Sequence, residues 1–121
     1  MAAFNIPLNL PHAATIAVRI VYHLRNVSAD PDVLGRGKDL VLLLEPHRDQ
    51  QDNGDAAAAE KVRQEAASLG RAIVDDIEKG KLGGDRLGQA IRNLFECLAL
   101  GEEGAAISLR AGENPNSLLR P

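Results

Sequence analysis

The residues best suited to hold a phosphate lie between Gly35 and Lys38, where two glycines alternate with basic side chains. A phosphate-binding loop places its glycines between a strand and a helix, and its lysine is followed by Ser or Thr, which holds magnesium. Here Asp39 follows the lysine, and the Gly-x-x-x-x-Gly frame is missing from the sequence. We therefore expect a loosened stretch of helix at these positions and no bound nucleotide or other cofactor.

Oxygen and imidazole groups gather between Glu45 and Asp55, where His47, Asp49 and Asp52 also occur. A calcium loop needs ligands at alternate positions around a glycine and a bidentate acid at its end, and this spacing does not match. Zinc sites use more His or Cys than this segment contains. A solvated acidic loop without a metal is the prediction, and a weak divalent-cation site is the alternative.

Cys97 and His23 are the remaining candidates for nucleophilic chemistry, which requires a base within hydrogen-bond reach of the thiol. Cys97 adjoins an apolar stripe, where a buried and inert thiol is expected. A single cysteine forms no internal disulfide, so a reducing compartment is the natural environment. We predict no enzymatic activity; a catalytic site shared between subunits is the less favoured alternative.

The composition indicates one globular domain with few functions open to it. The chain has 121 residues, 45% hydrophobic and only 2% aromatic, with a net charge of −3. Aromatic side chains anchor stacked bases and many small-molecule pockets, and the acidic balance gives nucleic acid and anionic membranes no electrostatic support. Arg19 interrupts the apolar run from Ala13 to Val21, so neither a signal peptide nor a membrane span is expected. We predict a cytoplasmic protein.

Two apolar stripes at helical spacing run through the second half of the chain. The first consists of Val62, Ala66, Leu69, Ile73 and Ile77, and the second of Leu87, Ile91, Leu94, Phe95 and Leu98. A glycine-rich breaker, residues 79–85, separates them. These stripes predict an antiparallel helical hairpin of residues 56–79 and 86–100, capped by Asp55 and Asp85 and ended by Gly80 and Gly101. Arg71 and Asp75 are expected to pair along the first of these helices.

The first half of the chain predicts two further helices. Residues 12–27 place apolar side chains over a broad face, which is typical of a mostly buried helix. Asp30 and Pro31 resemble a helix start, and the helix then runs to Leu44 before Pro46. The run from Leu40 to Leu44 alone is equally compatible with a buried strand; helix is favoured because leucine prefers it and the cap is good.

The segment before these helices alternates apolar and polar residues, as an extended strand or arm does. We expect an extended arm over residues 1–11, a single helical domain over residues 12–110 and a flexible tail over residues 111–121. The arm packs either on its own helices or on a second chain; these two alternatives stay open. The fold class is all-α, a small bundle of about four helices.

The surplus apolar surface of the first two helices and the alternating arm predict a non-catalytic protein–protein interaction module. An adaptor, an assembly subunit or an inhibitor fits this description, and a homo-oligomer, most simply a dimer, is expected. The identity of any other protein partner is not predicted. The residues expected to contact a partner are Phe4, Ile6, Leu8 and Leu10 in the arm, and Leu42 and Leu43 on the second helix.

A small DNA-associated regulator is the alternative function. The last helix of the expected hairpin would then present Arg86, Gln89, Arg92 and Asn93 to DNA. The acidic Glu96 on the same helix and the lack of a basic stripe disfavour this reading. Nucleic acid is therefore not the expected partner.

Overall fold

The computed structural model describes residues 7–28 and 30–112, and within these ranges the chain folds into helices without strands. The helices are α1 (Leu10–Val27), α2 (Pro31–Leu44), α3 (Ala56–Gly80), α4 (Asp85–Cys97) and α5 (Gly101–Gly112), with the 3-10 turn η2 (Glu45–His47) after α2. The predicted all-α class is confirmed. The described part of the chain contains five α-helices, one more than the four main helices expected. The ambiguous run from Leu40 to Leu44 is the end of α2 and is helical.

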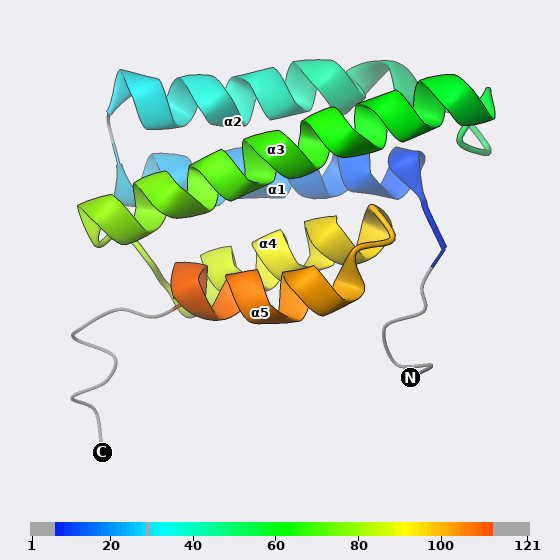
Figure 1. The fold of residues 1–121 in the computed structure, drawn as a ribbon. Coiled ribbons are helices and arrows are strands. Elements are labelled where there is room, and N and C mark those ends of the chain that lie inside the picture. Colours follow the sequence, from blue (N-terminus) through cyan, green and yellow to red (C-terminus); the bar gives the residue numbers. More distant parts are fainter. Residues whose placement is uncertain (1–6, 29, 113–121) are drawn as a thin grey trace.

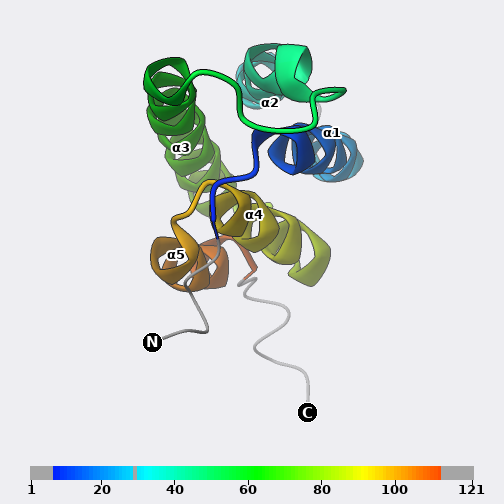
Figure 2. The same ribbon diagram turned by 90° about the vertical axis from the view of Figure 1, so that its right-hand side faces the viewer.

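The helices form two layers (Figures 1 and 2). α1, α2 and α3 lie together in one layer, with α1 and α2 side by side and running in opposite directions. α4 and α5 form the second layer, and α4 joins the layers through its contacts with α1. α4 packs mainly on α5 and α1 and only slightly on α3, so the predicted hairpin of α3 and α4 is not confirmed.

Side-chain caps explain where three of the helices begin. Asn9, Asp30 and Asp55 each accept a hydrogen bond from a backbone N–H in the first turn of α1, α2 and α3, respectively. These carboxylate and amide oxygens satisfy donors that have no partner within the helix. The predicted caps Asp30 and Asp55 are present. Asp85 is not a cap; Gly84 occupies that position and Asp85 is the first residue of α4.

The predicted last helix, residues 86–100, ends earlier than expected, because α4 stops at Cys97 and residues 98–100 form the turn before α5. The chain turns after Cys97, and Ala99 adopts a left-handed conformation with φ of 60°. Gly101 was expected to end a helix, but it is the first residue of α5. The reversal allows Ile107 and Ala111 of α5 to be buried, which a continuous straight helix would not.

Phe95 occupies the place where α3, α4 and α5 meet, and its side chain is fully buried. Gly70 of α3 lies against the ring: a Cβ there would be 2.7 Å from Phe95 Cε1. Gly104 of α5 lies against the base of the same side chain: a Cβ there would be 2.7 Å from Phe95 Cβ. Two glycines therefore make the space for the one aromatic residue in the core of the described region. No polar or charged residue is buried in that region.

Ion pairs fasten α5 to α3. Arg71 donates to the carboxylate of Glu103 at 2.6 and 2.8 Å. Arg110 donates to Asp75 at 2.7 Å and to Glu78 at 2.8 Å. The predicted pairing of Arg71 with Asp75 along α3 is wrong, because each side chain bonds a residue of α5 instead.

The start of the described chain is held by a residue from the loop between α2 and α3. The amide of Asn53 accepts from the N–H of Leu10 at 2.8 Å and donates to the carbonyl of Leu8 at 2.9 Å. The N–H of Asn9 donates to the carbonyl of Cys97 at 2.7 Å. α1 thus begins at Leu10, within the segment expected as an extended arm.

At the other end of the domain, α5 continues through Gly112, two residues into the expected tail. None of the helices in the described ranges combines the length and the apolar character needed to cross a bilayer.

Candidate protein-interaction surface

Exposed apolar side chains concentrate beside α2. The large hydrophobic residues exposed in the described region are Val18, Tyr22, Val27, Leu42 and Leu109. Three of them line one groove: Leu42 is 70% exposed, Tyr22 64% and Val18 44%. Because clustered apolar exposure marks interaction sites far better than scattered exposure does, this cluster identifies the candidate surface.

The first groove lies between α1 and α2 and has a volume of about 410 Å³. It is lined by Val18, Val21, Tyr22 and Arg25 of α1 and by Lys38, Val41 and Leu42 of α2. These positions recur at spacings of three and four residues, so they share one side of each helix. We refer to it below as the α1–α2 groove.

Gly37 allows the two helices of this groove to approach closely. A Cβ at this position would lie 3.1 Å from Leu24 Cδ1 and 3.1 Å from Val21 Cγ2. The glycine therefore serves helix packing, and no phosphate loop is formed around it, because Gly35 to Lys38 all lie inside α2.

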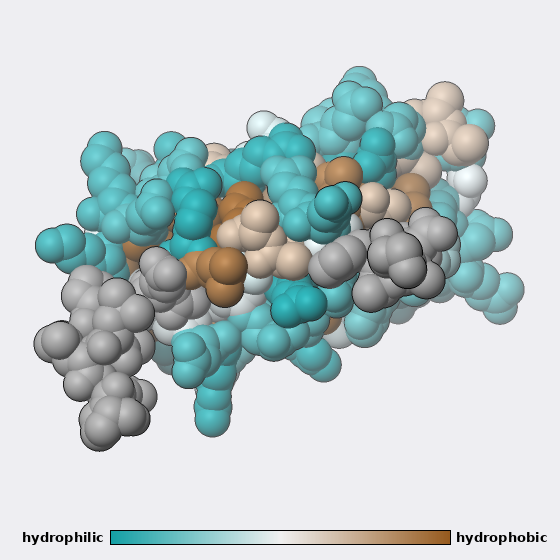
Figure 3. All heavy atoms as spheres, turned by 60° about the horizontal axis from the view of Figure 1, so that its bottom comes forward, coloured by the Kyte–Doolittle hydropathy of each residue, from teal (hydrophilic) through white to brown (hydrophobic). Residues whose placement is uncertain are grey.

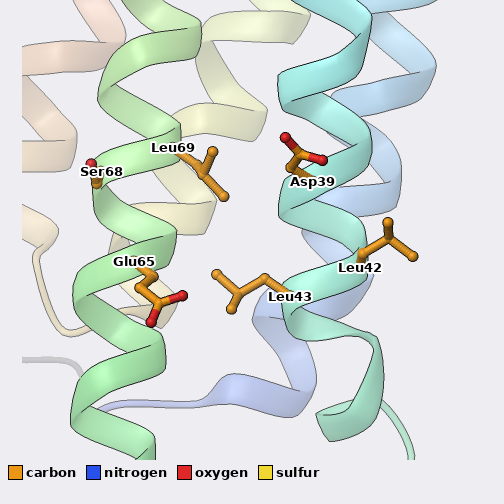
Figure 4. Close-up of a pocket in the computed structure, with 6 residues that line it drawn as sticks. All are labelled: Asp39, Leu42, Leu43, Glu65, Ser68 and Leu69. Atoms are coloured by element: carbon orange, nitrogen blue, oxygen red, sulfur yellow. The ribbon is translucent and has the colours of Figure 1, made fainter.

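The second groove, the α2–α3 groove, lies on the other side of α2 and has a volume of about 570 Å³. Its lining residues are Asp39, Leu42 and Leu43 of α2 and Glu65, Ser68 and Leu69 of α3. Figure 4 shows that Leu43 and Glu65 point toward each other and that Leu69 points from α3 toward α2. Leu42 points away from α3, toward the other side of α2.

The two grooves carry opposite charges. Arg25 and Lys38 line the α1–α2 groove, and Asp39 and Glu65 line the α2–α3 groove. All four side chains belong to exposed residues, and none has an ion-pair partner among the residues that the structure describes. α2 is therefore a ridge with an apolar, basic groove on one side and an apolar, acidic groove on the other.

The predicted contact residues differ in how much of their surface is exposed to a partner. Leu42 and Leu43 both lie on this ridge, with Leu43 partly buried. Leu8 is partly buried against the core, and Leu10 is fully buried and presents no surface to a partner. Phe4 and Ile6 lie outside the described residues.

Sequence reasoning did not single out Val18 and Tyr22, because the broad apolar face of residues 12–27 suggested a helix that is mostly buried. The available signal was Tyr22, whose hydroxyl needs water or a hydrogen-bond partner and so favours a position near the surface.

The residues of the DNA-binding alternative lie on α4. Arg86 and Gln89 are exposed, and the amide of Gln89 donates to Asn93 at 3.0 Å. Arg92 lies 3.6 Å from the carboxylate of Glu96. Figure 3 shows the side of the molecule formed by α4 and α5, where hydrophilic atoms surround a broken strip of apolar ones. DNA contact by this face stays a prediction.

Cys97 lies in a further pocket of about 390 Å³, together with His12 and Asn93. Burial raises the pKa of its thiol to about 11, and the nearby Glu96 carboxylate adds to the shift. The thiol is therefore protonated at neutral pH, which makes it a poor nucleophile. The dyad with His23 is not assembled: Cys97 bonds the residue preceding α1, and His23 is roughly 21 Å further along that helix at 1.5 Å per residue.

The acidic loop after α2 uses several of its polar groups to shape the backbone. His47 Nδ1 lies 3.1 Å from Gln50 Oε1, Asp52 accepts from the N–H of Gly54, and Asp55 caps α3. No group of three or more His, Cys, Asp or Glu side chains arranged to hold a metal ion occurs in residues 7–28 and 30–112.

A scan against protein-family models and searches of curated proteins and of solved structures find no match to this chain.

Proposed function

We propose that this chain is a non-catalytic protein–protein interaction module that binds its partner through the surface centred on α2. An adaptor, an assembly subunit and an inhibitor all act in this way. The observation that carries the proposal is the shared exposure of Val18, Tyr22 and Leu42 beside one groove. Burying a large apolar side chain stabilises a complex by about 1.5–3 kcal/mol before the costs of association, so this cluster is a source of affinity.

The charges around the grooves favour protein over other classes of partner. Across the whole ridge, Asp39 and Glu65 offset the positive charges of Arg25 and Lys38, so phosphate backbones and anionic membranes gain no net electrostatic attraction. A protein surface can offer apolar anchors together with charges of either sign. A helix laid along a groove is a common form of such recognition, because its side chains recur at the same spacing as those of α1 and α2.

A photo-crosslinking amino acid at position 42 tests the proposal in cells that express the protein. The matched control places the same amino acid at Leu109, which is 66% exposed on α5 and lines neither groove. We expect discrete protein adducts from position 42 and none of these from position 109. Equal adduct patterns from both positions, or no protein adduct from position 42, would contradict the proposed function.

A further inference from the structure

We infer that the partner of the α2 surface is a second copy of this chain, docked with α2 parallel to α2 about a two-fold axis along the helices. This inference names the partner of the surface proposed above and depends on that proposal. It follows from the different side chains that α2 carries on its two sides, which are complementary to each other.

One side of α2 carries a projecting apolar side chain next to a positive charge. Leu42 is 70% exposed and points away from α3 (Figure 4). Lys38 is four residues earlier, so it lies one helical turn away on the same side. Its ammonium group has no ion-pair partner in the described part of the chain.

The other side of α2 carries a groove that can bind an apolar side chain and a neighbouring positive charge. The α2–α3 groove offers the apolar side chains of Leu43 and Leu69, and its volume of about 570 Å³ is ample for a leucine side chain. Asp39 and Glu65 line the same groove and likewise lack ion-pair partners in the described region. A ligand for this groove should therefore present an apolar side chain beside a cation, which Leu42 and Lys38 do.

Two-fold symmetry decides how two copies can meet. An axis parallel to α2 places the α1 side of each copy over the α3 side of the other. Leu42 of each copy then enters the α2–α3 groove of the other, and Lys38 approaches Asp39 and Glu65 there. Every contact occurs twice, as in any isologous dimer.

An axis lying in the interface and perpendicular to α2 would produce a different pairing. It would place the α1 sides of both copies together, so Lys38 and Arg25 of one copy would face the same residues of the other. Like charges facing each other across an interface oppose association. The charge pattern therefore selects the parallel arrangement.

Light scattering after size exclusion tests the inference with two variants of opposite charge. Lys38→Glu places an acid beside the acidic groove, and Asp39→Lys/Glu65→Lys places bases beside Lys38. We expect the unmodified chain to be a dimer and each variant alone to be a monomer, with a dimer dissociation constant raised at least about tenfold. An equimolar mixture of the two variants should form a heterodimer, because both of its groove contacts become attractive again.

The mixture also controls for folding, because a misfolded variant cannot recover association by mixing. All substituted residues are exposed, and Leu109→Asp on α5 serves as a matched surface variant that should stay dimeric. A monomeric unmodified chain, or variants that stay dimeric alone, would overturn the second-copy inference. Adducts from position 42 to a different protein would in that case leave the proposed function standing, so the two failures are distinguishable.

Discussion

Replacing Gly35 and Gly104 by alanine, one at a time, should change stability in opposite directions. Both residues lie inside helices, Gly35 in α2 and Gly104 in α5. In a helix interior, alanine is favoured over glycine by about 0.8–1.0 kcal/mol, because glycine loses more backbone freedom on folding. The two sites share this gain and differ in what the new methyl group meets.

Apart from its chain neighbours and the backbone of its own helix, a Cβ at Gly35 would have no heavy atom within 4 Å. The propensity gain is therefore not offset by crowding. We expect Gly35→Ala to raise the free energy of unfolding by about 0.8–1.0 kcal/mol, which corresponds to about 4 °C in Tm for a domain of this size.

At Gly104 a Cβ would lie 2.7 Å from Phe95 Cβ and 3.3 Å from the carbonyl oxygen of Arg92. Neither atom is the end of a flexible side chain, so α5 must move away from α4. Inserting a methyl group into a packed interior costs about 1–3 kcal/mol, which exceeds the propensity gain. We expect Gly104→Ala to lower the free energy of unfolding by up to about 2 kcal/mol.

Urea unfolding followed by far-UV circular dichroism measures both changes, and an unchanged slope with denaturant shows that the same transition is compared. If Gly104→Ala stabilised the protein as much as Gly35→Ala does, α4 and α5 would not approach closely at Phe95. If Gly35→Ala destabilised it, this side of α2 would be packed against something in the folded protein.

Three further measurements test the remaining structural arguments. Iodoacetamide should label Cys97 about 100-fold more slowly in the folded than in the unfolded protein, since burial raises its pKa from an ordinary 9.0 to about 11; equal rates would contradict this. Asn53→Ala should lower the free energy of unfolding by about 1–3 kcal/mol and speed hydrogen exchange at the Leu10 amide; an unchanged exchange rate would contradict the hydrogen bond from Leu10 to Asn53. The Arg71 guanidinium holds the pKa of Glu103 below its ordinary 4.5, so this stabilisation is present above pH 4.5 and is lost as the pH falls through the folded pKa. Glu103→Gln should make the free energy of unfolding depend less steeply on pH in the acid range. An unchanged pH dependence would contradict the ion pair between Arg71 and Glu103.

Patterns that span only a few residues predicted the starts of two helices and the helical state of the leucines in α2. Asp30 and Asp55 identified the starts of α2 and α3, because a cap is a bond between residues two or three positions apart. The leucines at the end of α2 were assigned to a helix because leucine favours helices and the start of this helix is well capped. The break between α4 and α5 was predicted too late in the sequence, at Gly101 instead of after Cys97, because Ala99, unlike glycine, gives no sign that its φ is positive.

Features that depend on distant parts of the chain were not predictable. Arg71 has an acid at the right spacing within α3, yet it bonds Glu103, which is 32 residues away. In the candidate site, Leu42 and Leu43 were named from the sequence. Val18 and Tyr22 were not, because which part of a broad apolar face stays exposed is decided by the helices that pack on it.

The hydrogen bonds of Asn53 have a consequence for the order in which the chain folds during synthesis. Asn53 follows Leu10 by 43 residues, an interval of about 2–9 s at 5–20 residues per second. Until Asn53 has been synthesised, the carbonyl of Leu8 and the N–H of Leu10 lack the partner that they have in the folded structure. The bond from the N–H of Asn9 to the carbonyl of Cys97 can form only after Cys97, 88 residues later, has been synthesised. Residues 8–10 are therefore synthesised well before the residues that hold them, and they become fixed in place late.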